Sequence, residues 1–250
     1  MPVFHHGAVE IAYLDEGQGE PIVLVHGFAS SKEVNWVQPG WFVTLQGAGR
    51  RVIALDNRGH GRSSKLYDPA DYHTAKMAGD VHALLDHLNL PWADVMGYSM
   101  GARIVAFLAL EHSDRVRSMV LGGLGMHLID GVGLPESIAE ALEAPSLADV
   151  TDPQGRMFRA FADQTRSDRR ALAACIRGSR QVLTREQAGS IGTPTLVAVG
   201  TKDPIAGSAE TLAAVMPNAR ALPIPGRDHM LAVGDKAFKA GVLAFLEENA

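Results

Sequence analysis

A serine stands between two glycines in Gly97-Tyr-Ser-Met-Gly101, a spacing that can present a nucleophile at a sharp turn. A short apolar run precedes it, and apolar residues at helical spacing follow it from Ile104 to Leu110. This pattern predicts a strand, a tight turn and a helix with Ser99 at the apex. A side chain at either glycine would collide with neighbouring backbone, and the first helix amides would face developing negative charge. In this context the motif indicates a serine nucleophile.

A serine hydroxyl attacks a carbonyl efficiently only when a nearby base takes its proton. The chain has ten histidines that could do so. Three of them, His82, His87 and His112, fall on or at the end of predicted helices and are expected to face solvent. His229 lies in a loop between the last predicted strand and the final helix, and His26 directly follows a buried strand. These two are the candidates for the base.

Composition excludes several other classes of protein. The 250 residues carry a net charge of −5, without the basic face that nucleic acid binding needs. The single cysteine, Cys175, cannot form an internal disulfide and is expected to be a buried, inert thiol. We see no spaced His/Cys cluster for a metal, no phosphate-binding glycine loop, no signal peptide and no membrane span. We therefore expect a cytoplasmic protein without cofactor, metal, nucleic acid or membrane partners.

The elements that must position Ser99 alternate between strand and helix. Apolar runs predict strands at 8–14 (as an edge strand), 21–25, 52–55, 95–96, 116–121, 194–200 and 220–224. Helical patterns lie around 36–45 and at 74–88, after Ser99, and at 235–248. This alternation predicts an α/β fold with a mostly parallel central sheet flanked by helices on both faces.

One interval breaks the alternation. Residues 122–190 contain no convincing strand, only helical patterns near 136–143, 154–165 and 169–177. Structureless loops of this length are rare in a compact domain, so we expect an inserted helical cap. The predicted division is a core of residues 1–121 and 191–250 and a cap of residues 122–190. The cap would leave a strand at the end where open α/β sheets bind ligands.

The order of five motifs resembles that of the α/β-hydrolase fold family. They begin at His26 (His-Gly-Phe), Asp56 (Asp-Asn-Arg-Gly-His-Gly-Arg-Ser), Gly97, Gly200 (Gly-Thr-Lys-Asp) and Gly226 (Gly-Arg-Asp-His). The resemblance covers nearly the whole chain and is greatest to the small capped members: carboxylesterases, lactonases, carbon–carbon bond hydrolases and cofactor-free perhydrolases. Many of these have a second glycine after the motif, where this chain has an alanine at position 102.

The resemblance implies a role for each catalytic residue. The family's order of serine, acid and histidine makes His229 the base and Asp203 the acid that orients it. Asp130 is a weaker candidate for the acid, and Asp228 is expected to face solvent. His26 would then shape the loop that binds the oxyanion.

The oxyanion would be held by two backbone amides, those of Phe28 and Met100. We expect an apolar substrate pocket, to which eight side chains contribute: Tyr98, Leu124, Met126, Leu128, Ile129, Phe158, Phe161 and Met230. The arginines of the cap are expected to face solvent. In the competing reading, Arg156, Arg159 or their neighbours turn inward and bind a substrate carboxylate.

These residues predict a cofactor-free serine hydrolase, with a small-molecule ester or lactone as its partner. A carboxylesterase for small or medium acyl esters is the first expectation. A lactonase, carbon–carbon bond hydrolase or perhydrolase could use the same three residues. A ligand receptor with incidental hydrolysis is the alternative of another class. An epoxide hydrolase or dehalogenase is disfavoured, because those enzymes have an aspartate where this chain has Ser99.

Overall fold

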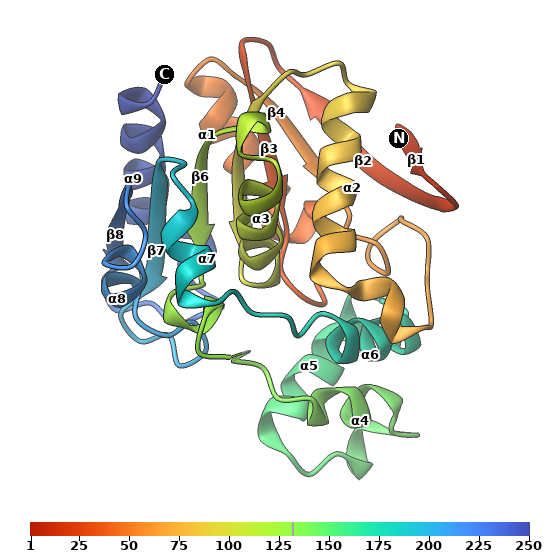
Figure 1. Cartoon of the computed structure of the whole chain (residues 1–250). Coiled ribbons are helices and arrows are strands. Elements are labelled where there is room, and N and C mark those ends of the chain that lie inside the picture. Colours follow the sequence, from red (N-terminus) through yellow and green to blue (C-terminus); the bar gives the residue numbers. More distant parts are fainter. Residues whose placement is uncertain (132) are drawn as a thin grey trace.

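Eight strands form one sheet in the order β1-β2-β4-β3-β5-β6-β7-β8 (Figure 1). The computed structural model describes residues 1–131 and 133–250. Pairing is antiparallel at β1–β2 and β2–β4 and parallel from β4 to β8. The strand bounds are β1 Val3–His6, β2 Val9–Glu16, β3 Glu20–Val25, β4 Arg50–Leu55, β5 Ala93–Tyr98, β6 Val116–Gly122, β7 Thr195–Gly200 and β8 Ala219–Ile224. The predicted mostly parallel sheet is confirmed.

Helices cover both faces of this sheet. On β3, Ile22 and Leu24 pack into one apolar cluster, while Val23 and Val25 pack into the other. Such burial on both sides is why the parallel strands read as continuous apolar runs. Helices α2 (Thr74–His87) and α3 (Met100–Glu111) belong to the cluster of Val23, and α1 (Trp41–Gly47) and α9 (Lys236–Glu248) to the cluster of Ile22.

The strand predicted at 8–14 is present as β2, but the prediction that it lies at the edge of the sheet was wrong. That segment, β2, lies between β1 and β4, and β1 forms the edge. Gly7 adopts a positive φ of 61°, which turns the chain back on itself and lets Phe4 pack against Tyr13 and His87. His87 is exposed, as expected, and its ring also stacks on Phe4 and hydrogen-bonds the Tyr13 hydroxyl.

The helical stretch expected around 36–45 is two helices. A short π-helix, Glu33–Val37, is followed by a turn at Gly40, whose φ of 80° breaks the helical path before α1 begins. A π-helical turn is uncommon and is often found near functional sites. Here it lies beside the loop that follows β3, and Asn35 binds the backbone of that loop.

Between β6 and β7 the described chain forms no strand. The three expected helices are present as α4 (Ser137–Glu143), α5 (Pro153–Gln164) and α6 (Arg169–Gly178), which gather at one end of the sheet (Figure 1). Helix α4 packs on α5 and α6, and α6 packs on the short helix Pro69–Tyr72. Helix α7 (Arg185–Ser190) was not predicted, because six residues are too few for a helical pattern. The division of the chain into core and cap stays a prediction.

Candidate active site

Ser99 lies at the sharp turn between β5 and α3. Its backbone has φ 55° and ψ −114°, a conformation that non-glycine residues rarely adopt. The two flanking glycines make this turn possible. A Cβ at Gly97 would overlap the backbone of Gly101, and a Cβ at Gly101 would overlap the carbonyl of Val25. The strained turn therefore needs both glycines, as the motif predicts.

Three predicted residues from three different loops meet at this turn. The Ser99 hydroxyl is 2.9 Å from His229 Nε2, and His229 Nδ1 is 2.7 Å from an Asp203 carboxylate oxygen. The Asp203 side chain is fully buried, and that of His229 is 8% exposed. A base in this position can take the serine proton, while the carboxylate fixes the imidazole tautomer and stabilises its charged form.

Backbone groups hold the acid and the base in place. The second carboxylate oxygen of Asp203 accepts hydrogen bonds from the amides of Ile205 (2.8 Å) and Ala206 (3.1 Å). The Tyr98 hydroxyl donates to the backbone carbonyl of His229 at 2.7 Å. Burial raises the pKa of the Tyr98 phenol, so it remains a donor at physiological pH. The residue before the serine thus anchors the loop that carries the histidine.

The other acidic candidates lie elsewhere. The Asp228 carboxylate is exposed and accepts from the amides of Met230 and Leu231, which caps its own loop. Asp130 is exposed as well. In the described structure neither carboxylate hydrogen-bonds His229, whereas that of Asp203 does. The geometry favours Asp203 as the partner of the histidine.

The loop after β3 carries Phe28, which lines both cavities together with Ser99. His26 donates from Nδ1 to the Gly27 carbonyl (2.8 Å) and accepts at Nε2 from the Asn57 amide (3.0 Å). These two bonds fix a neutral His26, and burial lowers its pKa. His26 therefore shapes the loop, and the described structure shows no hydrogen bond from it to Ser99.

A second buried histidine supports the same loop. His60 accepts the Ala29 amide at 3.2 Å and donates to the Arg58 carbonyl at 2.9 Å. Burial and the neighbouring His26 lower the pKa of His60 to about 3. Ala29 has a positive φ of 58°, so this loop is strained as well. Among the described residues, the amides of Phe28 and Met100 donate to no protein acceptor, as an oxyanion site requires.

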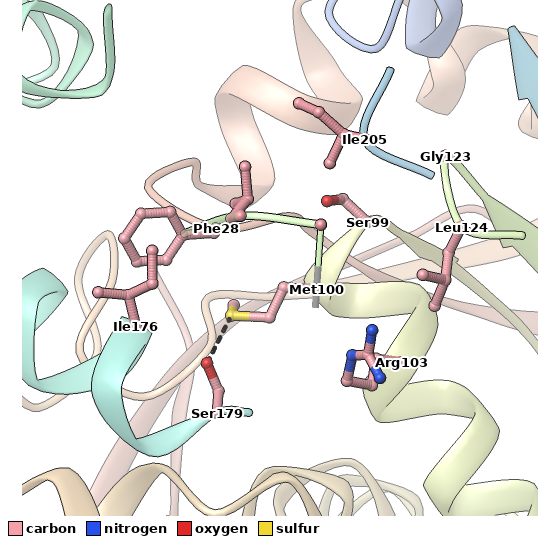
Figure 2. Close-up of a pocket in the computed structure, with 11 residues that line it drawn as sticks. Phe28, Ser99, Met100, Arg103, Gly123, Leu124, Ile176, Ser179 and Ile205 are labelled. Carbon is pink, nitrogen blue, oxygen red and sulfur yellow. Dashed lines mark hydrogen bonds between the residues drawn. The ribbon is translucent and has the colours of Figure 1, made fainter. Parts of the chain in front are cut away.

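Two cavities meet at Ser99. The small cavity, about 40 Å³, is lined by Phe28, Ser99, Met100, Arg103, Gly123, Leu124, Gly133, Leu134, Ile176, Ser179 and Ile205. Figure 2 shows the Ser99 hydroxyl pointing to the space between Phe28 and Ile205, with the Met100 sulfur directed at Ser179 below. The large cavity, about 430 Å³, is lined by Gly27, Phe28, Ser30, Val34, Asn35, Gln38, Pro39, Tyr98, Ser99, Leu134, Phe158, Phe161, His229, Met230 and Val233.

Most of the expected pocket residues lie in these cavities, but three do not. Leu124 lines the small cavity, and Tyr98, Phe158, Phe161 and Met230 line the large one. The exceptions lie in the loop after β6: Met126, Leu128 and Ile129.

Hydrogen bonds to the chain after β7 hold these three residues away from the cavities. The amides of Gly125 and His127 bind the Ala206 carbonyl, and the Met126 amide binds that of Ser208. These bonds join the loop to the segment after β7. Leu128 is thereby packed into the core, away from the cavity surface.

Among the arginines between β6 and β7, Arg156, Arg166, Arg170 and Arg185 are exposed as expected, and Arg159 is the exception. Arg159 is only 4% exposed, and it donates to the carbonyls of Ala141 and Ala144, so it joins α5 to the end of α4. Arg156 donates to two carbonyls of its own cap segment. The buried arginine that lines the small cavity is Arg103, on the helix after Ser99, which sequence reasoning did not select.

Arg103 joins two parts of the chain between β6 and β7. Its guanidinium donates to the carbonyls of His127 and Gly131, soon after β6, and to that of Gln181, after α6. Burial lowers the pKa of this guanidinium to about 10. Its position four residues after the serine was the available signal, since i and i+4 lie on one helix face.

The described residues contain no group of three or more His, Cys, Asp or Glu side chains placed to hold a metal ion. No helix in the described part of the chain is long and apolar enough to cross a membrane. Cys175 is buried 3.7 Å from the Met100 sulfur, and burial raises the pKa of its thiol to about 12.

Known proteins resemble this chain along most of its length. Residues 20–130 match the model of the α/β hydrolase fold. A non-heme chloroperoxidase of Kitasatospora aureofaciens, CPO-A1, is 28% identical over 96% of this chain and 97% of its own length. A putative non-heme chloroperoxidase of Synechocystis is 33% identical over 61% of this chain, and the match spans 54% of that relative. The crystal structure of a hydrolase from Pseudomonas aeruginosa superposes with a TM-score of 0.81 at 27% identity, covering 98% and 97% of the two chains. The match to the family model and the superposition over nearly the whole chain show that this chain has the α/β-hydrolase fold.

Proposed function

We propose that this protein is a serine carboxylesterase that cleaves esters of small or medium acyl groups through an acyl-enzyme. Ser99 attacks the carbonyl carbon, and His229 takes the proton of the hydroxyl and returns it to the leaving alcohol. Asp203 orients the imidazole and stabilises its charged form. The amides of Phe28 and Met100 hold the oxyanion. Water then attacks the acyl-enzyme and releases the acid.

The observation that carries the proposal is the hydrogen-bonded series from Ser99 through His229 to Asp203, at 2.9 and 2.7 Å. A purely structural role would not require a serine in a strained turn beside a buried base. An aspartate nucleophile, as epoxide hydrolases and dehalogenases use, is absent from the turn. The serine favours acyl transfer over those reactions.

The positions of the two cavities relative to His229 support a separate site for each half of the ester. His229 lines the large cavity but is not among the residues that line the small one. Because His229 must return its proton to the leaving oxygen, the alcohol lies in the large cavity. The acyl group then lies in the small cavity, which has room for only a few heavy atoms. Acetyl and propionyl esters fit this arrangement best.

Replacement of the nucleophile tests the proposal. We expect Ser99→Ala to fold normally and to lose esterase activity by a factor on the order of 10⁴ to 10⁶. A fluorophosphonate should label Ser99 in the wild type and leave the variant unlabelled, as judged by mass spectrometry of the digest. Labelling of a different serine would refute the assignment. A receptor with incidental hydrolysis would show one burst of product and then stall, whereas an esterase turns over steadily.

Perhydrolysis is the second candidate, because a relative that matches over nearly its whole length is named as a non-heme chloroperoxidase. Hydrogen peroxide would replace water at the acyl-enzyme, so that the ester oxygen of Ser99 leaves and a peracid forms. The test is to add peroxide to an acetate ester reaction and measure peracid against acetate. Peracid that is lost in Ser99→Ala supports this activity. Formation of acetate alone excludes it and leaves the esterase. Lactones and vinylogous diketones, assayed in parallel, test the lactonase and carbon–carbon hydrolase alternatives.

A further inference from the structure

A third cavity, about 500 Å³, adjoins the large cavity and is not lined by Ser99. Four residues line both of them: Ser30, Val34, Gln38 and Phe161. We call this cavity the basic groove. Its other lining residues are Ser31, Glu33, Gly61, Arg62, Lys65, Gln164, Thr165, Arg166 and Ser167. A ligand that starts at Ser99 and follows the large cavity past Phe161 therefore enters the basic groove.

The charged side chains of the groove are mainly positive. Arg62, Lys65 and Arg166 face a single acid, Glu33. The Glu33 carboxylate lies 3.2 Å from the buried Lys32 ammonium, which it shares with Asp56, so three positive side chains of the lining stand against one carboxylate. Lys65 is held by backbone, with its ammonium donating to the carbonyls of residues 60, 61 and 63. A positive charge is thus fixed at the wall of the groove.

The side chains of Arg62 and Arg166 are available to bind a ligand. Both are exposed, and the described structure shows neither side chain in an ion pair or hydrogen bond. Arg62 comes from the turn after β4, and Arg166 from the turn after α5, where its φ is 54°. By contrast, Arg177 is paired with Glu143, and Arg159 is bound to carbonyls. The two available guanidinium groups of this region thus come from core and cap and converge on one groove.

We propose that the basic groove binds a carboxylate at the far end of the substrate's alcohol. The preferred substrate is then an ester of a short acid with an ω-hydroxy carboxylic acid, with the acyl group in the small cavity and the alkyl chain in the large one. Arginine suits this task because its planar guanidinium can donate two parallel hydrogen bonds to a carboxylate. This inference rests on the proposed esterase function and specifies its substrate class.

The kinetic test compares two esters that differ only in their end group. 8-Acetoxyoctanoate ends in a carboxylate, and octyl acetate, of equal chain length, ends in a methyl group. We expect the ratio of their kcat/KM values to favour the carboxylate in the wild type and to fall about tenfold in the double variant Arg62→Met, Arg166→Met. We expect no such preference for the shorter 4-acetoxybutanoate over butyl acetate, since a chain four carbons shorter should end in the large cavity, whose lining has no arginine or lysine.

The control variant is Arg185→Met, an exposed arginine on α7 that does not line any of the three cavities. The carboxylate preference should remain in this variant. An equal fall in Arg185→Met and in the double variant would mean a general effect of net charge and would overturn the proposal. So would an unchanged ratio in the double variant, provided its melting temperature matches that of the wild type.

A binding measurement separates this inference from the esterase proposal. In Ser99→Ala, which cannot form an acyl-enzyme, calorimetry compares 8-hydroxyoctanoate with its neutral amide. Tighter binding of the carboxylate that is lost with Arg62→Met and Arg166→Met supports the groove even if the wild type hydrolyses no ester. Equal binding of acid and amide refutes the groove even if the wild type is an active esterase.

Discussion

The small and the large cavity share Phe28, Ser99 and Leu134, but the rest of their walls comes from different segments of the chain. The small cavity, about 40 Å³, is bounded by the turn at Ser99, the chain after β6 and helix α6. The side chains that line it are almost all buried. The large cavity, about 430 Å³, is bounded by the π-helix, helix α5 and the loop of His229. Its wall includes Met230, which is 46% exposed.

This difference has a consequence for specificity. Buried walls are close-packed, so a group one methylene too large meets resistance from the whole core. An exposed side chain such as Met230 can change rotamer at little cost. We therefore expect strict selection on the acyl side and tolerance on the alcohol side. Leu124→Ala tests this expectation directly, Asp203→Asn disables the catalytic residues at which both cavities meet, and His60→Gln affects the loop that they share.

The largest effect is expected from Asp203→Asn. The amide cannot accept the hydrogen bond from His229 Nδ1 in the same way, which favours the wrong imidazole tautomer. We expect kcat to fall by about 10³ to 10⁴ for every ester, whichever cavity its larger part occupies. Steady-state kinetics on acetate and butyrate esters measure this. Asp228→Asn is the control and should keep near-normal activity. An active Asp203→Asn beside an inactive Asp130→Asn would show that the acid was misassigned.

A smaller effect is expected from Leu124→Ala, which enlarges the small cavity. Each additional buried methylene of the acyl group contributes about 0.8 kcal/mol, which corresponds to a factor of about four. The ratio of kcat/KM for butyrate over acetate should therefore rise several-fold, while the preference among alcohols should not change. Leu128→Ala is the matched control, since Leu128 is buried without lining either cavity. A shift in alcohol preference instead would reverse the assignment of the cavities.

The smallest effect concerns the loop that the two cavities share. The pKa of His60 is lowered to about 3 in the folded state, against an ordinary value near 6.5. Between these values the unfolded state binds the proton more readily than the folded state does. Stability from this histidine is therefore complete above pH 6.5 and is lost as pH falls, by about 2 kcal/mol between pH 7 and 5.

Urea denaturation at pH 7.5 and pH 5.0 measures this loss. His60→Gln removes the titrating group and keeps a polar side chain near the Ala29 amide. The variant should be less stable at pH 7.5 but should lose less stability on acidification than the wild type. Equal losses in both proteins would mean that His60 does not carry the pH dependence.

Local sequence determined the elements and the turn at the nucleophile. The apolar runs of β3 through β7 predict buried strands because both faces of a parallel sheet are covered. The glycines at 97 and 101 predict the turn because a Cβ at either position would overlap other backbone atoms. At Gly97 these atoms belong to residues close in sequence, and at Gly101 to the end of the adjacent strand β3. The order of motifs was enough to select Ser99, Asp203 and His229, which the structure brings together.

Tertiary structure decided what surrounds these residues. No pattern near Met126, Leu128 or Ile129 shows that bonds to the chain after β7 turn their loop away from the cavity. Whether an arginine is buried or available is decided by acceptors elsewhere in the chain: Arg159 binds a carbonyl of α4, and Arg103 binds carbonyls after β6 and after α6. Strands and tight turns depend on neighbours in sequence, whereas the walls of a cavity depend on which segments, far apart in the chain, pack against one another.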